Sequence, residues 1–282
     1  MAGISNYIII DFRGLSQILI TFLTHLSVHR RYSHHAGVFI VSFIPLPYRI
    51  MALVQEQNRL FGFPMDRLAC IIGECGFRCG CCGTCCTRSV NGHVFLLDHD
   101  VRLIRTIDPD AVEPAPGPEF CDDSGTSYVS GFALRTKGDP EGSCWFLENS
   151  RCRIYEQRPS ACRIYPFMLR RKPDAEGNVD WRFFAQGGGH GEYYHPLSWE
   201  VCLALACDII MHEHAVLTQE ISFLEVVEKY FSKHGIQPDN TPCNDPGRQF
   251  PDGGPVPVMV YYAGTLEKHH VKRPASYPPG GR

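Results

Sequence analysis

Cysteine is the residue type whose number and spacing could do chemistry in this chain. The segment CGFRCGCCGTCC, residues 75–86, holds six cysteines in twelve residues. Thiolate sulfur is a soft ligand that suits zinc, iron and iron–sulfur clusters. In the spacing Cys79-x2-Cys82-x2-Cys85, two intervening residues allow the chain to fold back, so that successive thiolates reach one metal or one cluster. The segment therefore indicates a metal centre.

The same spacing indicates which metals the centre could hold. Three cysteines separated by two residues are typical of the bacterial ferredoxin run, whose thiolates bind a 4Fe–4S cluster. Gly80 and Gly83 stand between these cysteines, where tight turns and backbone N–H groups directed at sulfur are useful. Because tetrahedral zinc binds the same thiolates, the sequence favours a 4Fe–4S iron–sulfur cluster and leaves zinc open.

Later cysteines supply the remaining ligands that such a centre needs. Three follow about sixty residues after the first group, and one more stands before the longest helical pattern. The candidate ligands are Cys79, Cys82, Cys85, Cys86, Cys144, Cys152, Cys162 and Cys202. Because Cys85 and Cys86 are adjacent, their side chains diverge and would serve different centres. We therefore expect two metal centres, or one centre and a redox-active thiol.

Disulfides are the main alternative use of the fourteen cysteines. A disulfide needs Cα atoms roughly 4.4–6.8 Å apart, so the neighbours Cys81-Cys82 and Cys85-Cys86 cannot pair without strain. A chain of 282 residues can also bury a core without covalent cross-links. We therefore expect metal-bound thiolates in a reducing, cytoplasmic compartment.

The cysteine pattern also resembles that of a known family. The stretches FRCGCCGTCC, GSCWFL and CRIYEQRPSACRIYPF, followed by Cys202, are similar to the YkgJ family, a zinc- or iron-chelating domain with a CxxCxxCC signature. The resemblance covers about residues 78–202 and implies that all eight candidates are metal ligands. Family members often carry Pro-Gly after the last cysteine, whereas Leu203-Ala204 stands here, so Cys207 stays an alternative to Cys202.

Arginines near the third cysteine group could support the metal. A thiolate–metal centre carries negative charge, and in a partly dry site it needs positive charge and hydrogen-bond donors nearby. Arg158 and Arg163 bracket Cys162 and are the candidates for this supporting role, with Arg153 a weaker one. The alternative is that these arginines pair with surface carboxylates such as Glu156.

Composition limits the classes of partner. The formal net charge of −3, from 27 basic and 30 acidic residues, gives no broad basic field, so we expect no nucleic-acid partner. The apolar run at residues 15–28 is shorter than the roughly 20 residues of a membrane span, so we expect no membrane partner. His190 and His195 are interpreted as ordinary loop histidines, with the alternative that one of them replaces a cysteine ligand. We therefore expect the partner to be an unidentified protein or redox partner.

The elements around the cysteines predict an α+β fold with much loop. We call residues 75–86 the cysteine loop. Apolar residues at helical intervals predict a helix before this loop, interrupted by Gly62 and Pro64. VFLLDHDVRLIRTI begins like a strand and continues as a helix with Asp98 as its N-cap, and SYVSGFALRT alternates like one strand. CRIYPFMLRRKPDAEGNVDWRFFAQ predicts a β-hairpin, and the longest helix is predicted between Cys207 and Lys233.

Three parts follow from this pattern. Residues 1–50 are an apolar N-terminal extension, with Met51 as an alternative first residue of the native protein. Residues 51–236 are the cysteine-cluster metal-binding domain. Residues 237–282 are rich in proline and glycine, and we expect an extended or disordered tail with one strand.

Three hypotheses about function follow. The first is a metal-binding protein that holds an iron–sulfur cluster or zinc and works in electron transfer or assists a partner enzyme. The second is a structural zinc module whose surface binds a protein. The third is a protein lysine methylase-like enzyme, because flagellin lysine-N-methylases carry a similar cysteine domain. The sequence leaves open whether the chain is an enzyme, and it indicates no catalytic residues.

Overall fold

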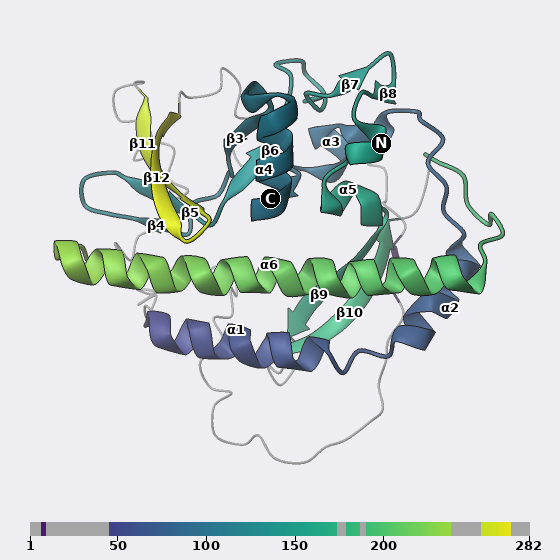
Figure 1. Cartoon of the computed structure of the whole chain (residues 1–282), viewed down its shortest axis with the longest axis horizontal. Helices are drawn as coiled ribbons and strands as arrows, with labels where there is room; N and C mark the ends of the chain where they lie inside the picture. Colours follow the sequence, from purple (N-terminus) through teal and green to yellow (C-terminus); the bar gives the residue numbers. More distant parts are fainter. Residues whose placement is uncertain (1–6, 10–44, 174–178, 187–189, 238–254, 272–282) are drawn as a thin grey trace, which may run out of the picture. The chain divides into compact units, whose positions relative to one another are not determined.

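The computed structural model describes residues 7–9, 45–173, 179–186, 190–237 and 255–271 (Figure 1). These residues form helices and several small sheets, which confirms the predicted α+β class and the long C-terminal helix. The chain divides into two units, each of which is described by itself. Unit 1 comprises Met1–Thr84, Asn149–Cys152 and Ser160–Thr218, and unit 2 comprises Cys85–Glu148, Arg153–Pro159 and Gln219–Arg282.

Unit 1 combines helices with one three-stranded sheet. Its elements are β1 (Tyr7–Ile9), α1 (Leu46–Leu60), α2 (Met65–Cys75), β8 (Arg151–Cys152), α5 (Ser160–Ile164), β9 (Phe167–Pro173), β10 (Val179–Gln186) and the first part of α6 (Trp199–His234). β9 and β10 form the predicted antiparallel hairpin (Figure 1), with Phe167 opposite Ala185. β1 pairs with the other edge of β10.

The helix before the cysteine loop is present as two helices, divided where the sequence predicts a break. α1 buries Leu46, Leu53 and Leu60, whose spacing of seven residues places all three on one face. α2 ends at Gly76, whose left-handed backbone (φ 52°) lets its N–H donate to the Ile72 carbonyl. The glycine thereby ends the helix and turns the chain into the cysteine loop.

Unit 2 is built on two small sheets. Its elements are α3 (Arg88–Asn91), β2 (Phe95–Leu96), α4 (Asp98–Ile107), η3 (Pro109–Ala111), β3 (Val112–Pro114), β4 (Phe120–Cys121), β5 (Ser127–Val129), β6 (Phe132–Leu134), β7 (Leu147–Glu148), η4 (Tyr155–Gln157), β11 (Val256–Tyr262), β12 (Thr265–Val271) and the rest of α6. One sheet has the strand order β12-β11-β5-β4, and the other has the order β2-β6-β3.

The prediction of one strand in SYVSGFALRT is wrong, because the segment breaks at Gly131. β5 and β6 lie on either side of this break and belong to different sheets. A Cβ at Gly131 would come within 2.6 Å of the Gln219 side-chain nitrogen and 2.9 Å of the Phe95 ring. A side chain at the point where the chain passes from one sheet to the other would therefore displace Gln219 and Phe95.

The prediction of Asp98 as the N-cap of α4 is also wrong. The capping position is Leu97, and Asp98 is the first residue of the helix. The Asp98 carboxylate accepts the Ala263 N–H at 3.1 Å, while Asp100 accepts the Leu97 N–H at 3.3 Å. Asp100 thus does the capping, and Asp98 instead connects α4 to the β11–β12 turn.

The predicted C-terminal tail contains two strands rather than one. β11 and β12 form an antiparallel hairpin, and β11 pairs in parallel with β5, Val258 opposite Ser127. The two-residue turn has positive φ at both Ala263 (46°) and Gly264 (83°), as the tightest hairpin turns require. Residues 238–254 and 272–282 of the predicted tail lie outside the described residues, as does most of the predicted N-terminal extension.

Helix α6 is the predicted long helix, and it begins at Trp199, before the predicted start. Its predicted apolar face is largely buried, including Leu217, Leu224 and Val227. In unit 2 the Phe231 ring lies 4.8 Å from the Tyr128 ring in an edge-to-face arrangement. α6 is long and apolar enough to cross a membrane, a test that the core helices of soluble proteins pass as well.

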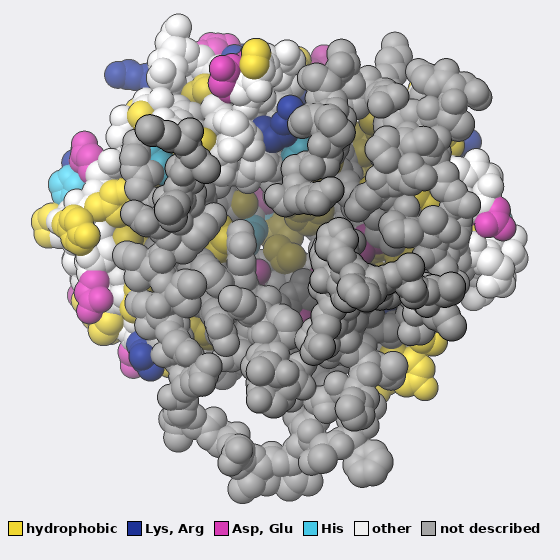
Figure 2. Space-filling view, turned by 180° about the vertical axis from the view of Figure 1, so that it is seen from behind, with side chains coloured by type: hydrophobic (Ala, Val, Ile, Leu, Met, Phe, Trp, Pro, Cys, Tyr) yellow, Lys and Arg dark blue, Asp and Glu magenta, His cyan; other side chains and the backbone are white. Residues whose placement is uncertain are grey.

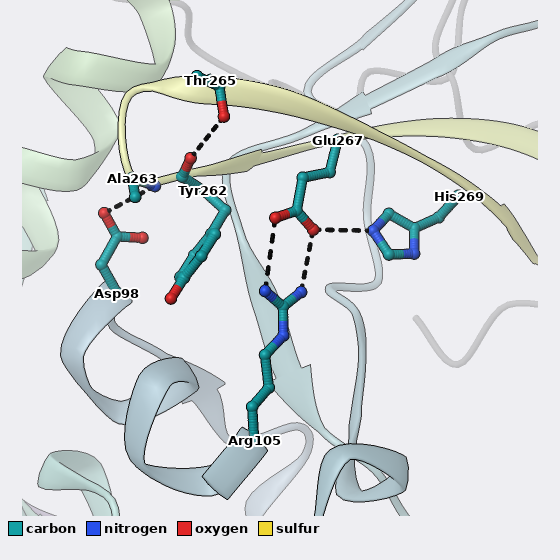
Figure 3. A network of polar contacts seen from close by, with 7 residues as sticks. All are labelled: Asp98, Arg105, Tyr262, Ala263, Thr265, Glu267 and His269. Carbon is teal, nitrogen blue, oxygen red and sulfur yellow. Dashed lines mark hydrogen bonds and ion pairs between the residues drawn. The ribbon is translucent and has the colours of Figure 1, made fainter.

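A group of side chains centred on Arg105 connects α4 to β12 within unit 2, and we call it the Arg105 network. Arg105 donates to both carboxylate oxygens of Glu267, at 3.4 and 3.0 Å, and the carboxylate is 3.2 Å from His269 (Figure 3). The guanidinium carbon lies 4.6 Å from the ring centres of both Phe132 and Tyr262. Every charged group of this network has a protein partner.

Charged side chains are dispersed over the face of the molecule in Figure 2. Much of this face is occupied by residues that are not described, and among the described side chains visible there both basic and acidic groups appear.

Candidate metal centre

The first part of the cysteine loop is held by backbone hydrogen bonds within unit 1. Arg78 and Glu192 form an antiparallel bridge, in which each N–H donates to the other carbonyl at 2.8 Å. The Tyr194 N–H donates to the Cys75 carbonyl at 2.8 Å, and the His195 N–H donates to the Gly76 carbonyl at 2.9 Å. The residues before Cys79 are therefore fixed against a segment more than a hundred residues later in the chain.

The Cys82 sulfur lies among hydrogen-bond donors. It accepts hydrogen bonds from the side chain and the backbone of Thr84, from the Gly191 backbone and from its own backbone N–H. These bonds lower the pKa of the Cys82 thiol below its ordinary value. Cys82 is exposed, so its sulfur combines thiolate character with access for a metal. Such donors around a sulfur are what metal-bound thiolates need.

The eight predicted ligands are distributed over both units. Cys79, Cys82, Cys152, Cys162 and Cys202 belong to unit 1, and Cys85, Cys86 and Cys144 belong to unit 2. Cys202 is buried, Cys82 is exposed and the others are half-buried, and none of the eight forms a disulfide. The three-residue repeat of the cysteine loop thus spans the division between the units, with Cys85 in the short helix η2 (Thr84–Cys86).

Two predicted ligands from different cysteine groups meet in unit 2. The Cys144 N–H donates to the Cys86 carbonyl at 2.8 Å. The pairing continues through a bridge between Thr87 and Ser143. The structure therefore brings together the end of the cysteine loop and the second cysteine group, which are far apart in the sequence.

Cys202 lies in a different environment from the other candidates. Its sulfur is 3.4 Å from the position that a Cβ would take at Gly73 of α2, so it packs closely against that helix. Burial, together with Cys70 and Glu200, raises the pKa of the Cys202 thiol. The alternative candidate Cys207 is exposed. The ligand role of Cys202 stays a prediction, and its surroundings favour the neutral thiol.

The two predicted supporting arginines differ in their contacts. Arg158 donates from Nε to the Tyr155 carbonyl at 2.8 Å, and its guanidinium lies 3.7 Å from the Tyr155 ring centre. Arg163 is exposed on α5. The weaker candidate Arg153 pairs with Glu148 at 3.2 Å, as the alternative interpretation of a surface ion pair expects. The supporting role of Arg158 and Arg163 stays a prediction.

The ligand set as a whole stays a prediction. Within the described residues, no three His, Cys, Asp or Glu side chains are arranged to hold a metal ion. The donor types fit zinc and iron, because the cysteine loop offers soft sulfur atoms, and hydrogen-bond donors surround the sulfur of Cys82.

The sequence analysis did not identify His93 as a candidate ligand. Its Nδ1 atom is buried and, within the described residues, has no hydrogen-bond partner. Burial and the charge of Arg88 lower the pKa of His93, which favours the neutral imidazole that binds metals. His93 belongs to unit 2, as do Cys85, Cys86 and Cys144. The position of His93 in the sequence, shortly after the cysteine loop, is the feature that could have indicated it as a candidate ligand.

Comparison with known families gives this region an identity. Residues 78–183 match the family model CxxCxxCC, described as "Putative zinc- or iron-chelating domain". The match covers less than half of the chain. It agrees with the predicted resemblance, and it includes every predicted ligand except Cys202. No curated protein and no solved structure matches the chain.

Proposed function

We propose that the CxxCxxCC domain binds a 4Fe–4S cluster through its cysteine loop, and that the chain works in electron transfer or assists a partner enzyme. The observation that carries the proposal is the Cys82 sulfur with its hydrogen-bond donors, inside the spacing Cys79, Cys82 and Cys85. A bound cluster would supply one-electron transfer. The protein would contribute the three thiolates and a fourth from the later cysteines.

The donors around Cys82 support a negatively charged centre. Hydrogen bonds from N–H groups to cluster sulfurs stabilise the charge and help to set the reduction potential. These donors come from Thr84, two residues after Cys82, and from Gly191 in a later segment of the same unit. They support a thiolate at Cys82 that a metal could bind.

Zinc is a second candidate, supported by a different observation in unit 2. Cys86 and Cys144, whose backbones are hydrogen-bonded, belong to the same unit as His93, whose buried Nδ1 has no partner among the described residues; thiolates and a neutral imidazole are common ligands of structural zinc sites. Zinc bound there would stabilise the fold and would not transfer electrons. In either case we place the protein in the reducing cytoplasm, where thiolates persist, with a protein as its partner.

Metal analysis of the full chain, purified without oxygen, separates these candidates. The proposed cluster predicts about four iron and four sulfide per chain, with a broad visible absorption that dithionite bleaches. Zinc without colour would reject the redox role and leave the structural one. A chain that retains both metals would support two metal centres. Neither iron nor zinc, after reconstitution under reducing conditions, would contradict both candidates.

A further inference from the structure

A short segment outside the matched domain completes the cysteine loop. We call residues His190–His195 the strap. The family match ends at residue 183, so the strap is not part of it. Within unit 1 the strap pairs with the loop through Arg78 and Glu192, and Arg78 Nη1 also lies 3.2 Å from Nε2 of His195. Cysteine loop and strap thus form one two-stranded structure.

Gly191 is the point at which the strap reaches the predicted ligand. Its Cα lies 3.7 Å from the position that a Cβ would take at Gly80, between the predicted ligands Cys79 and Cys82, and its backbone is one of the groups that lower the pKa of the Cys82 thiol. Its φ is +69°, and an added Cβ would lie 2.4 Å from the Phe77 ring. Both the backbone conformation and the adjacent ring therefore require glycine here. Any side chain would push the strap, and with it the N–H donor, away from Cys82.

His190 anchors the strap one residue earlier. It is only 8% exposed, and its Nε2 is hydrogen-bonded to the Tyr165 hydroxyl. The Phe77 ring packs edge-on against Tyr165 at 5.8 Å and against Tyr193 at 5.3 Å. The aromatic cluster therefore fixes the residues on both sides of Gly191.

We infer that the strap is a working part of the metal centre: the Tyr165–His190 hydrogen bond holds Gly191 against the cysteine loop beside Cys82. This inference rests on the proposed thiolate metal site, but it holds for iron and zinc alike. His190 and Tyr165 are positioning residues, because they act on the ligand through Gly191. The strap stabilises the negative charge of the bound sulfur and thereby tightens metal binding.

Cobalt(II) titration of the full, reduced chain tests the inference, because thiolate-bound cobalt gives a sulfur-to-metal charge-transfer absorption. Gly191→Ala should weaken cobalt binding about 10- to 100-fold and shift this absorption. The matched control is Gly138→Ala, because an added Cβ meets nothing within 4 Å there and the backbone is not left-handed. The control should bind cobalt like the wild type.

A second pair of variants avoids the backbone strain at Gly191. His190→Ala should weaken cobalt binding, whereas His190→Gln should restore most of it, because a glutamine amide can still bond to the Tyr165 hydroxyl. The melting temperatures of the metal-free variants show whether a loss comes from unfolding. A strap that only stabilises the fold would lower these temperatures and leave the charge-transfer absorption of bound cobalt unshifted.

The outcomes separate this inference from the proposed function. Wild-type cobalt absorption that is weakened and shifted in Gly191→Ala and rescued in His190→Gln supports the strap. Wild-type absorption that Gly191→Ala and His190→Ala leave unchanged overturns the strap and leaves the thiolate site intact. A wild-type chain without sulfur–cobalt absorption overturns the proposed site and the strap together.

Discussion

The Arg105 network of unit 2 and the part of the cysteine loop around Cys82, in unit 1, use polar side chains in opposite ways. In the network, Arg105, Glu267 and His269 satisfy one another, and the guanidinium is enclosed by two aromatic rings. In the loop, donors converge on the sulfur of Cys82, which is exposed. The comparison suggests that the network stabilises the fold and that the loop is built to bind something the chain does not supply.

The largest expected effect belongs to the loop. Cys82→Ser should weaken metal binding by more than about 100-fold, because it removes a ligand rather than a residue that supports one. Cys81→Ser is the matched control, since Cys81 is the neighbouring thiol outside the predicted ligand set. Metal competition titrations of the reduced chain measure both. Equal affinities for the two variants would contradict the assignment of Cys82.

The second-largest expected effect is a loss of stability in unit 2, with metal binding unchanged. Gly131→Ala forces a Cβ against Gln219 and Phe95, so we expect a loss of roughly 1–3 kcal/mol in the free energy of unfolding. Urea denaturation measures it, with Gly138→Ala as the control that meets no neighbour within 4 Å. If the variant lost metal affinity without losing stability, the separation of roles between the regions would be wrong.

The Arg105 network should give a smaller loss of stability. Arg105→Met removes the hydrogen bonds to Glu267 and the contacts with two rings, which together contribute about 1–2 kcal/mol at a partly exposed site. Arg105→Lys should fall in between, because lysine keeps the charge but not the two-pronged geometry. Thermal melts provide the measurement, and identical melting temperatures for all three chains would refute a stabilising role.

The smallest expected effect is a dependence on pH. Partial burial acts to raise the pKa of Glu267, but hydrogen bonds and charges from Arg105 and His269 lower it below the ordinary value of 4.5. A lowered pKa in the folded chain means that the contribution is present above pH 4.5 and is lost as the pH falls through the folded-state value.

Glu267→Gln should therefore cost less than about 1 kcal/mol at neutral pH, and it should make stability less sensitive to acid below about pH 4.5. Unfolding curves at several pH values compare the variant with the wild type. An unchanged acid response would show that the Glu267 carboxylate does not contribute through its charge.

Local patterns explain what the sequence predicted of the fold. The hairpin β9–β10 and the apolar face of α6 follow from residues that are close in the chain, so alternation and helical spacing were sufficient to predict them. The break at Gly131 depends on contacts with Gln219 and Phe95. β11 pairs in parallel with β5, although more than a hundred residues separate the two strands in the sequence. A pattern of neighbouring residues does not predict contacts between residues that are so far apart in the sequence.

The same distinction applies to the candidate site. The spacing of Cys79, Cys82 and Cys85 is local, and it led to the family that residues 78–183 match. The role of Gly191 is not local, because it depends on the Phe77 ring and on a hydrogen bond to a sulfur more than a hundred residues earlier. In the sequence GGGHG, this glycine is indistinguishable from a turn residue.

X-ray absorption at the iron and zinc edges of the full chain, purified without oxygen, tests the central claim most directly. The account predicts a first shell of sulfur at about 2.3 Å from the metal, reduced in Cys82→Ser and retained in Cys81→Ser. A first shell of oxygen or nitrogen alone, unchanged by Cys82→Ser, would contradict the claim that the cysteine loop is a metal centre.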